Sequence, residues 1–191
     1  MEGRERLALD PPVDCGYAVG GHKPLQRIHY VETSMQVRLA TINDAERISL
    51  LNADVQKLHA DALPRLFKPP SNETFSASTV IELLNDPNNY FFIGHIDGEA
   101  IGYIYAEIRC TPETTTRYAM AQLYIHHISI PPRHQHKGYG EKLIQVVKAL
   151  AHDNGITTIA LDVWSFNTYA RAFFAKQGFT VFNERMWTVI G

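Results

Sequence analysis

The sequence predicts an α/β fold in which a mixed, mostly antiparallel and twisted sheet is flanked by helices, forming one domain over residues 35–191. Apolar runs rich in β-branched residues alternate with segments whose apolar residues recur every three to four positions. Asp97-Gly98 stands between two such runs and is a strong hairpin signal, which favours antiparallel pairing. With 191 residues and 45% hydrophobic content, the chain is long enough for one domain with a sizeable core.

Residues 1–34 differ from the rest of the chain. Prolines and glycines interrupt any regular period there, at Pro11, Pro12, Gly16, Gly20, Gly21 and Pro24. We expect a loosely structured extension, followed by a domain that begins at Met35.

The first elements of the domain are a strand and a helix. Val37 and Leu39 indicate the strand, and Thr41 with Asp44 forms a capping pair for the helix that follows. The helix carries one apolar stripe, formed by Ile48, Leu51, Val55, Leu58 and Ala62. The proline-rich run 63–70 then predicts a loop.

The remaining elements follow from the same patterns. The helices are expected at Ala77–Leu84, from Leu143 onward, and at Tyr169–Lys176. The strands are expected at Tyr90–Ile96, Ile101–Ile108, Tyr124–Ile130, Thr158–Val163 and Thr180–Ile190, and the last of these closes the sheet.

The stretch 124–141 organises the chain, because a strand there leads through a basic turn and two glycines into a helix. The first N–H groups of a helix have no intrahelical partner, and the helix dipole adds positive potential. Gly138 and Gly140 allow close approach of a phosphate. Basic or titratable side chains surround the turn, namely Arg133, His134, His136, Lys137 and Lys142. The stretch therefore predicts an anion site.

Two common phosphate motifs do not fit these residues. A P-loop ends in Gly-Lys-Ser/Thr, which is absent from this chain. A dinucleotide fingerprint needs a third small residue where Leu143 stands and a strand that leads directly into the glycines, whereas Pro131 and Pro132 intervene.

The residues Gln135-x-x-Gly138-x-Gly140 resemble the acyl-CoA signature of the GNAT family of N-acetyltransferases. A second block, Asn167-x-x-Ala170-x-x-Phe173-Phe174 followed by Gly178-Phe179, is similar to another segment of that family. The resemblance covers roughly residues 36–190. It implies a sheet splayed between two central strands, and direct transfer of an acetyl group from acetyl-CoA to a primary amine of a small molecule or peptide.

The resemblance also implies cofactor-binding residues. The turn would bind the pyrophosphate through backbone N–H groups, the strand edge would bond the pantetheine amides, and Asn167 would contact the cofactor from the other side. These residues are Ile128, Ile130, Gln135, His136, Lys137, Gly138, Tyr139, Gly140, Glu141 and Asn167.

His126 and Tyr124 are the catalytic candidates. Strand alternation places Tyr124, His126, Ile128 and Ile130 on one face, with His127 on the other. An imidazole can accept a proton at neutral pH. Because some members of the resembled family place a Glu or His at positions matching Tyr124 and His126, the resemblance implies His126 as the base, with a structural histidine as the equal alternative. Phe174 stands where many family members have a tyrosine that serves as the acid. Tyr124 is then a candidate acid, or no acid is required.

Composition limits the partners. The net charge of −2 gives no global field for nucleic acid or anionic membranes, and no apolar run is long enough to span a membrane. The histidines lack a metal-ligand pattern, so no metal is expected. Without a secretory signal, a cytoplasmic enzyme is the default. A homodimer through an edge strand near the carboxyl end is possible, and a non-catalytic acyl-CoA-binding or regulatory module is the alternative function.

Overall fold

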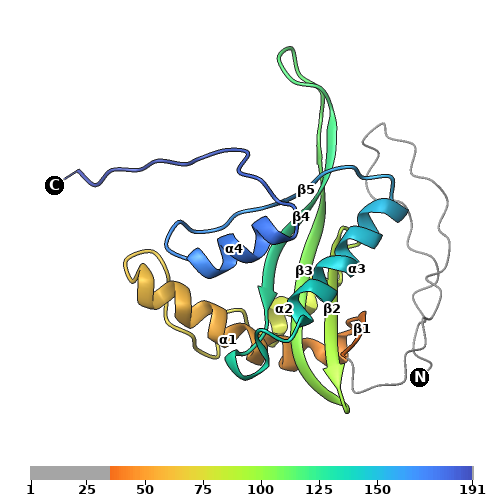
Figure 1. Ribbon diagram of the computed structural model, residues 1–191, viewed down its shortest axis with the longest axis vertical. Coiled ribbons are helices and arrows are strands. Elements are labelled where there is room, and N and C mark those ends of the chain that lie inside the picture. Colours follow the sequence, from red (N-terminus) through yellow and green to blue (C-terminus); the bar gives the residue numbers. More distant parts are fainter. Residues whose placement is uncertain (1–34, 191) are drawn as a thin grey trace.

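The computed structural model describes residues 35–190, so the predicted extension 1–34 lies outside the described residues. One five-stranded sheet runs in the order β1-β2-β3-β4-β5 (Figure 1). The strands are β1 Gln36–Leu39, β2 Asn89–Ile96, β3 Glu99–Thr111, β4 Met120–Ser129 and β5 Ile159–Leu161. All neighbouring strands are antiparallel except β4 and β5, which are parallel. The prediction of a mixed, mostly antiparallel sheet is confirmed.

Four α-helices accompany the sheet in the described range. They are α1 Ala45–Ala62, α2 Ala77–Leu84, α3 Tyr139–Asp153 and α4 Thr168–Lys176, and two short 3-10 helices lie at Ile42–Asp44 and Pro132–His134. The predicted capping pair is present, because Thr41 N–H donates to the Asp44 carboxylate at 2.7 Å. Ser76 caps α2 by accepting from the Thr79 N–H at 3.2 Å.

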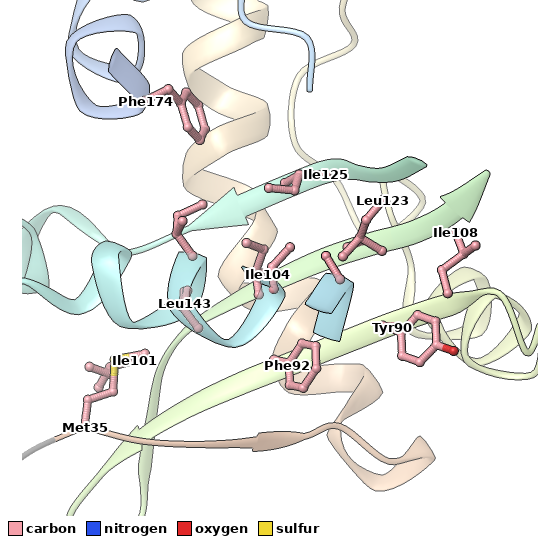
Figure 2. Close-up of a cluster of buried hydrophobic side chains, with 14 residues drawn as sticks. Met35, Tyr90, Phe92, Ile101, Ile104, Ile108, Leu123, Ile125, Leu143 and Phe174 are labelled. Carbon is pink, nitrogen blue, oxygen red and sulfur yellow. The ribbon is translucent and has the colours of Figure 1, made fainter. Parts of the chain in front are cut away.

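The sheet separates two apolar cores because successive side chains of a strand point to opposite faces. Tyr90 and Phe92 of β2 join the core that packs against α3 and α4 (Figure 2), with Leu143 and Phe174 from those helices. Phe91 of β2 joins the second core, on the other face, which packs against α1 and α2. The site described below lies along β4, between these two layers.

The C-terminal segment is a correction to the predicted fold. Thr180–Ile190 was expected to be a closing strand, but no strand is present in residues 180–190. Figure 1 shows this segment leaving α4 and running away from the sheet. Its apolar side chains are exposed. The segment has the composition of a strand, but no strand of the described chain pairs with it. No helix of the described range is long and apolar enough to cross a membrane.

Candidate active site

The glycine turn joins β4 to α3 in the conformation that the sequence predicts. Gly138 is the N-cap of α3 and has φ +79°, and His136 is also left-handed at φ +60°. The first helical hydrogen bond at this end runs from the Lys142 N–H to the Gly138 carbonyl at 3.2 Å. The N–H groups before Lys142 therefore have no acceptor within the helix. A Cβ on Gly138 would meet no atom within 4 Å. The turn therefore presents backbone donors toward open space.

Gly140 has a different role from Gly138. A Cβ on Gly140 would approach the Phe173 ring to 3.1 Å, so the glycine lets α3 pack closely against α4. The two sequence blocks noted above thus meet in space, through Gly140 of the first and Phe173 of the second.

The strands β4 and β5 pair over only three residues. The register joins Leu123 to Ile159, Tyr124 to Ala160 and Ile125 to Leu161, and it ends there. Strand β4 continues to Ser129 with β3 as its partner on the other side. From His126 onward, the edge of β4 that faces β5 thus has no strand partner in the described range. Strands β4 and β5 thus separate before the glycine turn, which is the splaying that the family resemblance implies.

Some polar side chains in and near the turn already have hydrogen-bond or ion-pair partners within the chain. Gln135 donates from Nε2 to the Ile130 carbonyl at 2.8 Å, so this side chain holds the turn against the end of β4. Arg133 pairs with Glu99 at 2.7 Å, which offsets one of the charges expected to attract an anion. Asn167 caps α4, since its Oδ1 accepts from the Ala170 N–H at 3.0 Å.

A β-bulge corrects the predicted faces of β4. Tyr105 of β3 pairs with His127 while Ala106 pairs with Ile125, so His126 is the extra residue. Both histidines consequently lie against the Tyr105 ring, with centroid distances of 4.4 Å for His126 and 5.9 Å for His127. Ile128 and Ile130 instead pack against the opposite core, near α3. The predictions that these isoleucines share a face with His126, and that His127 does not, are wrong.

His126 lies in a polar cluster with two residues of β3. His126 Nε2 lies 2.7 Å from Glu107 Oε2, and Arg109 Nε donates to the same oxygen at 2.7 Å. An ionised carboxylate only accepts hydrogen bonds, so Nε2 carries the proton and Nδ1 keeps its lone pair. Tyr124 completes the cluster, because the Arg109 guanidinium lies 3.6 Å from its ring centroid.

The cluster sets the protonation of its members. Burial lowers the pKa of His126 below its ordinary 6.5, and the Glu107 hydrogen bond only partly opposes this. Burial acts to raise the pKa of Glu107, but hydrogen bonds from Arg109 and His126 outweigh it and the pKa is lowered. Burial and the Asp162 carboxylate raise the pKa of Tyr124. At neutral pH the site therefore holds a neutral imidazole, a carboxylate and a protonated phenol.

His127 belongs to a second, more enclosed chain of hydrogen bonds. Asn52 Nδ2 donates to the Tyr103 hydroxyl at 2.7 Å, and that hydroxyl lies 3.3 Å from His127 Nδ1. Burial lowers the pKa of His127 to about 4, so the ring is neutral and can accept the tyrosine proton. This network ties α1 to the centre of the sheet.

Aromatic rings from separate segments meet beside the site. Phe67, in the loop after α1, lies 5.0 Å from the His59 ring and 5.2 Å from Trp164. Phe166 adds an edge contact to His59 at 6.0 Å. The loop 63–70 is thus packed against the segment between β5 and α4. We refer to His59, Phe67, Trp164 and Phe166 as the aromatic cluster.

Phe174, which replaces the tyrosine common in the resembled family, is buried in the core of Figure 2. Its ring contacts Phe173 and Phe179 at 5.2 and 5.5 Å. It offers no proton donor. Two phenols adjoin the candidate base, Tyr105 at 4.4 Å and Tyr124 at 4.9 Å between ring centroids. The Tyr105 hydroxyl donates to Asn89 Oδ1 at 3.1 Å, so Tyr124 is the acid candidate of the two.

Sequence reasoning did not single out Arg109, and it did not place Glu107 against His126. The available signal was their spacing of two residues on one strand, which places both on one face. Their meeting with His126 depends on the pairing of β3 with β4. Within residues 35–190, no group of three or more potential ligands could hold a metal ion.

The fold is that of known acyltransferases. The BH1408 protein from Bacillus halodurans, solved as a tetramutant, matches with a TM-score of 0.78 at 18% identity, covering 81% of this chain and 99% of that chain. An aminoglycoside N-acetyltransferase, AAC(6')-Iy, solved in complex with CoA, matches with a TM-score of 0.64 at 18% identity, covering 85% of this chain and 99% of that chain. At these identities the likeness shows the fold.

The sequence shows the family. Residues 53–179, more than half of the chain, match the family described as "Acetyltransferase (GNAT) family". An uncharacterized N-acetyltransferase in the pepI 3' region of Lactobacillus delbrueckii subsp. lactis is 25% identical over 103 residues, which are 54% of this chain and 58% of that relative. The chain thus spans just over half of that relative's length. It belongs to the GNAT acetyltransferase family, whose members are acyltransferases.

Proposed function

We propose that this protein transfers the acetyl group of acetyl-CoA directly to a primary amine of a small molecule or peptide. One observation carries the proposal. The separation of β4 from β5 after Ile125 opens onto the glycine turn at one end and the Glu107–His126 pair at the other. A donor-rich anion site and a neutral, oriented base thus lie along one strand edge.

The residues fit acetyl-CoA in their donor chemistry. The N–H groups from His136 to Glu141 would hold the pyrophosphate, because Gly138 leaves the space before them open. The freed edge of β4 at Ile128, with Ile130 just beyond the end of the strand, would bond the pantetheine amides, and the Ile130 carbonyl already accepts from Gln135. Gln135 would keep the turn in register, and Asn167 would face the cofactor from the start of α4. When bound, acetyl-CoA supplies an activated acetyl group.

His126 is the proposed base. Its Nδ1 lone pair would take a proton from the acceptor amine, directly or through one water, while Nε2 stays bonded to Glu107. The carboxylate fixes the tautomer and stabilises the imidazolium once the proton has arrived. Arg109 opposes early protonation of His126 by its positive charge. Glu107 is accordingly a positioning residue.

Tyr124 is the proposed acid. Burial and the Asp162 carboxylate raise its pKa, so the phenol keeps its proton at neutral pH and can donate it to the leaving group. Arg109 lies over the ring and fixes its orientation.

The aromatic cluster is the proposed acceptor side of the site. It joins the loop after α1 to the segment after β5, in which Trp164 stands three residues beyond Leu161, where the pairing of β4 with β5 ends. Aromatic faces attract a protonated amine, and the half-buried His59 stays uncharged because burial lowers its pKa. The similar structures include an aminoglycoside acetyltransferase in complex with sisomicin and a ribosomal-protein-alanine N-acetyltransferase. An aminoglycoside and a peptide with a free amino terminus are therefore suitable first acceptors.

Phe174 keeps one alternative open, namely a non-catalytic acyl-CoA-binding or regulatory module. Its buried phenyl ring cannot donate the proton that the common tyrosine supplies. The two functions share the cofactor site and differ in turnover alone.

A ligand-binding assay and a turnover assay test the proposal together. Thermal unfolding with CoA, acetyl-CoA or NAD tests the cofactor site, because a ligand at about 100 times its Kd adds about 2.7 kcal/mol of stability. In a chain of this size that stability corresponds to a rise in Tm of roughly 5–10 °C. Release of the free CoA thiol from acetyl-CoA in the presence of these acceptor amines then tests for enzymatic turnover. A rise in Tm without turnover supports the binding module, and protection by NAD alone contradicts both functions.

A further inference from the structure

The imidazole of His126 is the last ring of a stack that crosses three strands. Tyr105 of β3 lies flat against Phe91 of β2, with 4.2 Å between ring centroids and 4° between ring planes. His126 of β4 lies flat against Tyr105 in turn, at 4.4 Å and 7°. Because β3 runs between β2 and β4 (Figure 1), Phe91 covers one side of the phenol ring and His126 covers the other. We refer to these three rings as the ring stack.

The ring stack is buried at one end and open at the other. Phe91 is 1% exposed and Tyr105 is 5% exposed, whereas 24% of the His126 side chain is exposed. Side chains that are closely packed in a core sit in single rotamers, so Phe91 and Tyr105 present one fixed surface to the imidazole. Of the three rings, the imidazole alone lies where a substrate could reach it.

Hydrogen bonds and an edge contact also hold the middle ring of the stack. The Tyr105 hydroxyl donates to Asn89 Oδ1 at 3.1 Å, and Asn89 Nδ2 donates to the Leu83 carbonyl of α2 at 3.1 Å. Burial raises the pKa of Tyr105 to about 12, so the hydroxyl keeps the proton that it donates. The His127 ring lies against Tyr105 at 5.9 Å and 77°, which closes a further side. Tyr105 therefore cannot turn without breaking contacts to several elements.

The hydrogen bond to Glu107 does not by itself determine where His126 points. Nε2 lies at the far end of the ring from Cβ, so rotation about χ2 moves Nε2 little and moves Nδ1 much. The χ2 torsion of a histidine is broad and has no sharp preferred value. The accepting lone pair of Nδ1 lies in the ring plane, so this plane decides the direction in which a proton can be accepted. A flat contact with Tyr105 fixes the plane that the hydrogen bond leaves open.

We propose that Tyr105, held by Phe91, is a positioning residue for the transfer reaction, whose ring face fixes the plane of the His126 imidazole and so aims Nδ1 at the acceptor amine. The inference rests on the proposed role of His126 as the base. As the amine nitrogen bonds to the acetyl carbon and the thioester C–S bond breaks, the amine proton passes to Nδ1, and Tyr124 protonates the thiolate that leaves. A misdirected Nδ1 lone pair slows this proton transfer without weakening the binding of either substrate.

Steady-state kinetics of matched variants tests this role. Tyr105→Leu removes the ring face, so kcat should fall about tenfold or more while the KM for acetyl-CoA stays within about threefold. Tyr105→Phe keeps the ring face and loses only the hydroxyl, so it should retain kcat within about threefold. The control is Phe92→Leu, which removes a buried ring from β2 on the opposite face of the sheet. Equal losses of kcat in Tyr105→Leu and Phe92→Leu, or a kcat of Tyr105→Phe as low as that of Tyr105→Leu, overturn the proposal.

A milder variant tests the same role if Tyr105→Leu does not fold. Phe91→Leu leaves Tyr105 in place and removes the ring that supports its far side. Its kcat should fall by a smaller factor, with the KM for acetyl-CoA again unchanged. An original kcat in a folded Phe91→Leu overturns the supporting part that the proposal gives to Phe91.

Histidine NMR tests the orientation without any need for turnover. His126→Gln identifies the His126 signals among those of the nine histidines. The ring current of an aromatic face shifts the protons of a ring stacked on it upfield. The His126 ring protons should therefore be upfield in the original protein and in Tyr105→Phe, and should move downfield in Tyr105→Leu. Signals that are the same in all three proteins overturn the proposal. Upfield signals in a protein that turns over no amine would contradict the proposed function instead, while the imidazole would still be held by Tyr105.

Discussion

Glu107 Oε2 accepts a hydrogen bond from Nε2 of His126 at 2.7 Å, and the two residues come from neighbouring antiparallel strands. The bond fixes which imidazole nitrogen is available to a substrate. It exists because Glu107 pairs with Tyr124, and His126 follows Tyr124 by two residues on the same face of β4. The orientation of the base is therefore set by strand register.

Replacing Glu107 by glutamine should lower kcat and move its pH dependence. The neutral amide no longer stabilises the imidazolium, so the pKa of His126 falls further and the acid limb of kcat shifts to lower pH. We expect kcat at neutral pH to drop about tenfold or more, because the tautomer is less firmly held. The control is Asp153→Asn, which alters an exposed His–carboxylate pair outside the site. An unmoved acid limb in Glu107→Gln would remove Glu107 as a positioning residue.

Replacing His126 by glutamine should abolish most turnover while leaving CoA affinity unchanged. General-base catalysis contributes about 100-fold or more, so kcat should fall by at least that factor. In the unchanged enzyme, kcat should decline as pH falls through the pKa of His126, which lies below 6.5 because the ring is buried. His152→Gln, at an exposed position near the end of α3, serves as the control. If kcat of His126→Gln stays within threefold of the original, another group is the base.

Gly138→Asp should abolish CoA binding through bulk and negative charge at the phosphate site. Its matched control is Gly98→Asp, because Gly98 has nearly the same φ, +80° against +79°, and equally open space around it. Both variants should lose about 1 kcal/mol of stability from the left-handed backbone, and only Gly138→Asp should lose the CoA-dependent rise in Tm. Equal CoA affinities in the two variants would contradict the placement of the pyrophosphate.

Phe67→Ala should raise the KM for the amine several-fold without changing CoA affinity, because Phe67 packs in the aromatic cluster against Trp164. Leu66→Ala is the control, since Leu66 is its exposed neighbour in the same loop. Steady-state kinetics with the amine that gives turnover provides the measurement. The acceptor side must be placed elsewhere if both variants keep the original KM.

Local sequence patterns were sufficient to predict an element when its own residues determine where it begins and ends. The helix α2 begins and ends at the predicted residues, because Ser76 caps one end and the apolar period ends before Asn85. The helix after the glycine turn was likewise predicted, from its own apolar period, and the structure adds that Gly138 is left-handed.

Features that depend on pairing between distant strands were not predictable. The bulge at His126 adds one residue relative to β3, and simple alternation along β4 cannot reveal it. The cluster of Glu107, Arg109 and His126 depends on the register in which β3 pairs with β4. The segment Thr180–Ile190 has the composition of a strand, yet composition alone does not show whether a neighbouring strand is available to pair with it.

The ion pair between Arg38 and Asp44 should make stability depend on pH in the acid range. Arg38 donates to both Asp44 oxygens, at 2.7 and 2.8 Å, and with a further bond from the Thr41 N–H it lowers the pKa of Asp44 to about 2. A carboxyl group whose pKa is lower in the folded state stabilises the protein above its unfolded pKa, near 3.8, and this stabilisation disappears as pH falls toward 2.

Denaturant unfolding of the original protein and of Asp44→Asn between pH 2 and 7 measures this contribution. The original protein should be more stable by about 1 kcal/mol above pH 4, after allowance for solvent screening, and the two should converge near pH 2. Asp61→Asn is the control, because the Lys57–Asp61 pair is exposed on both sides and contributes little. An advantage for Asp44 that persisted unchanged to pH 2 would show that the carboxylate acts through helix capping geometry and not through its charge.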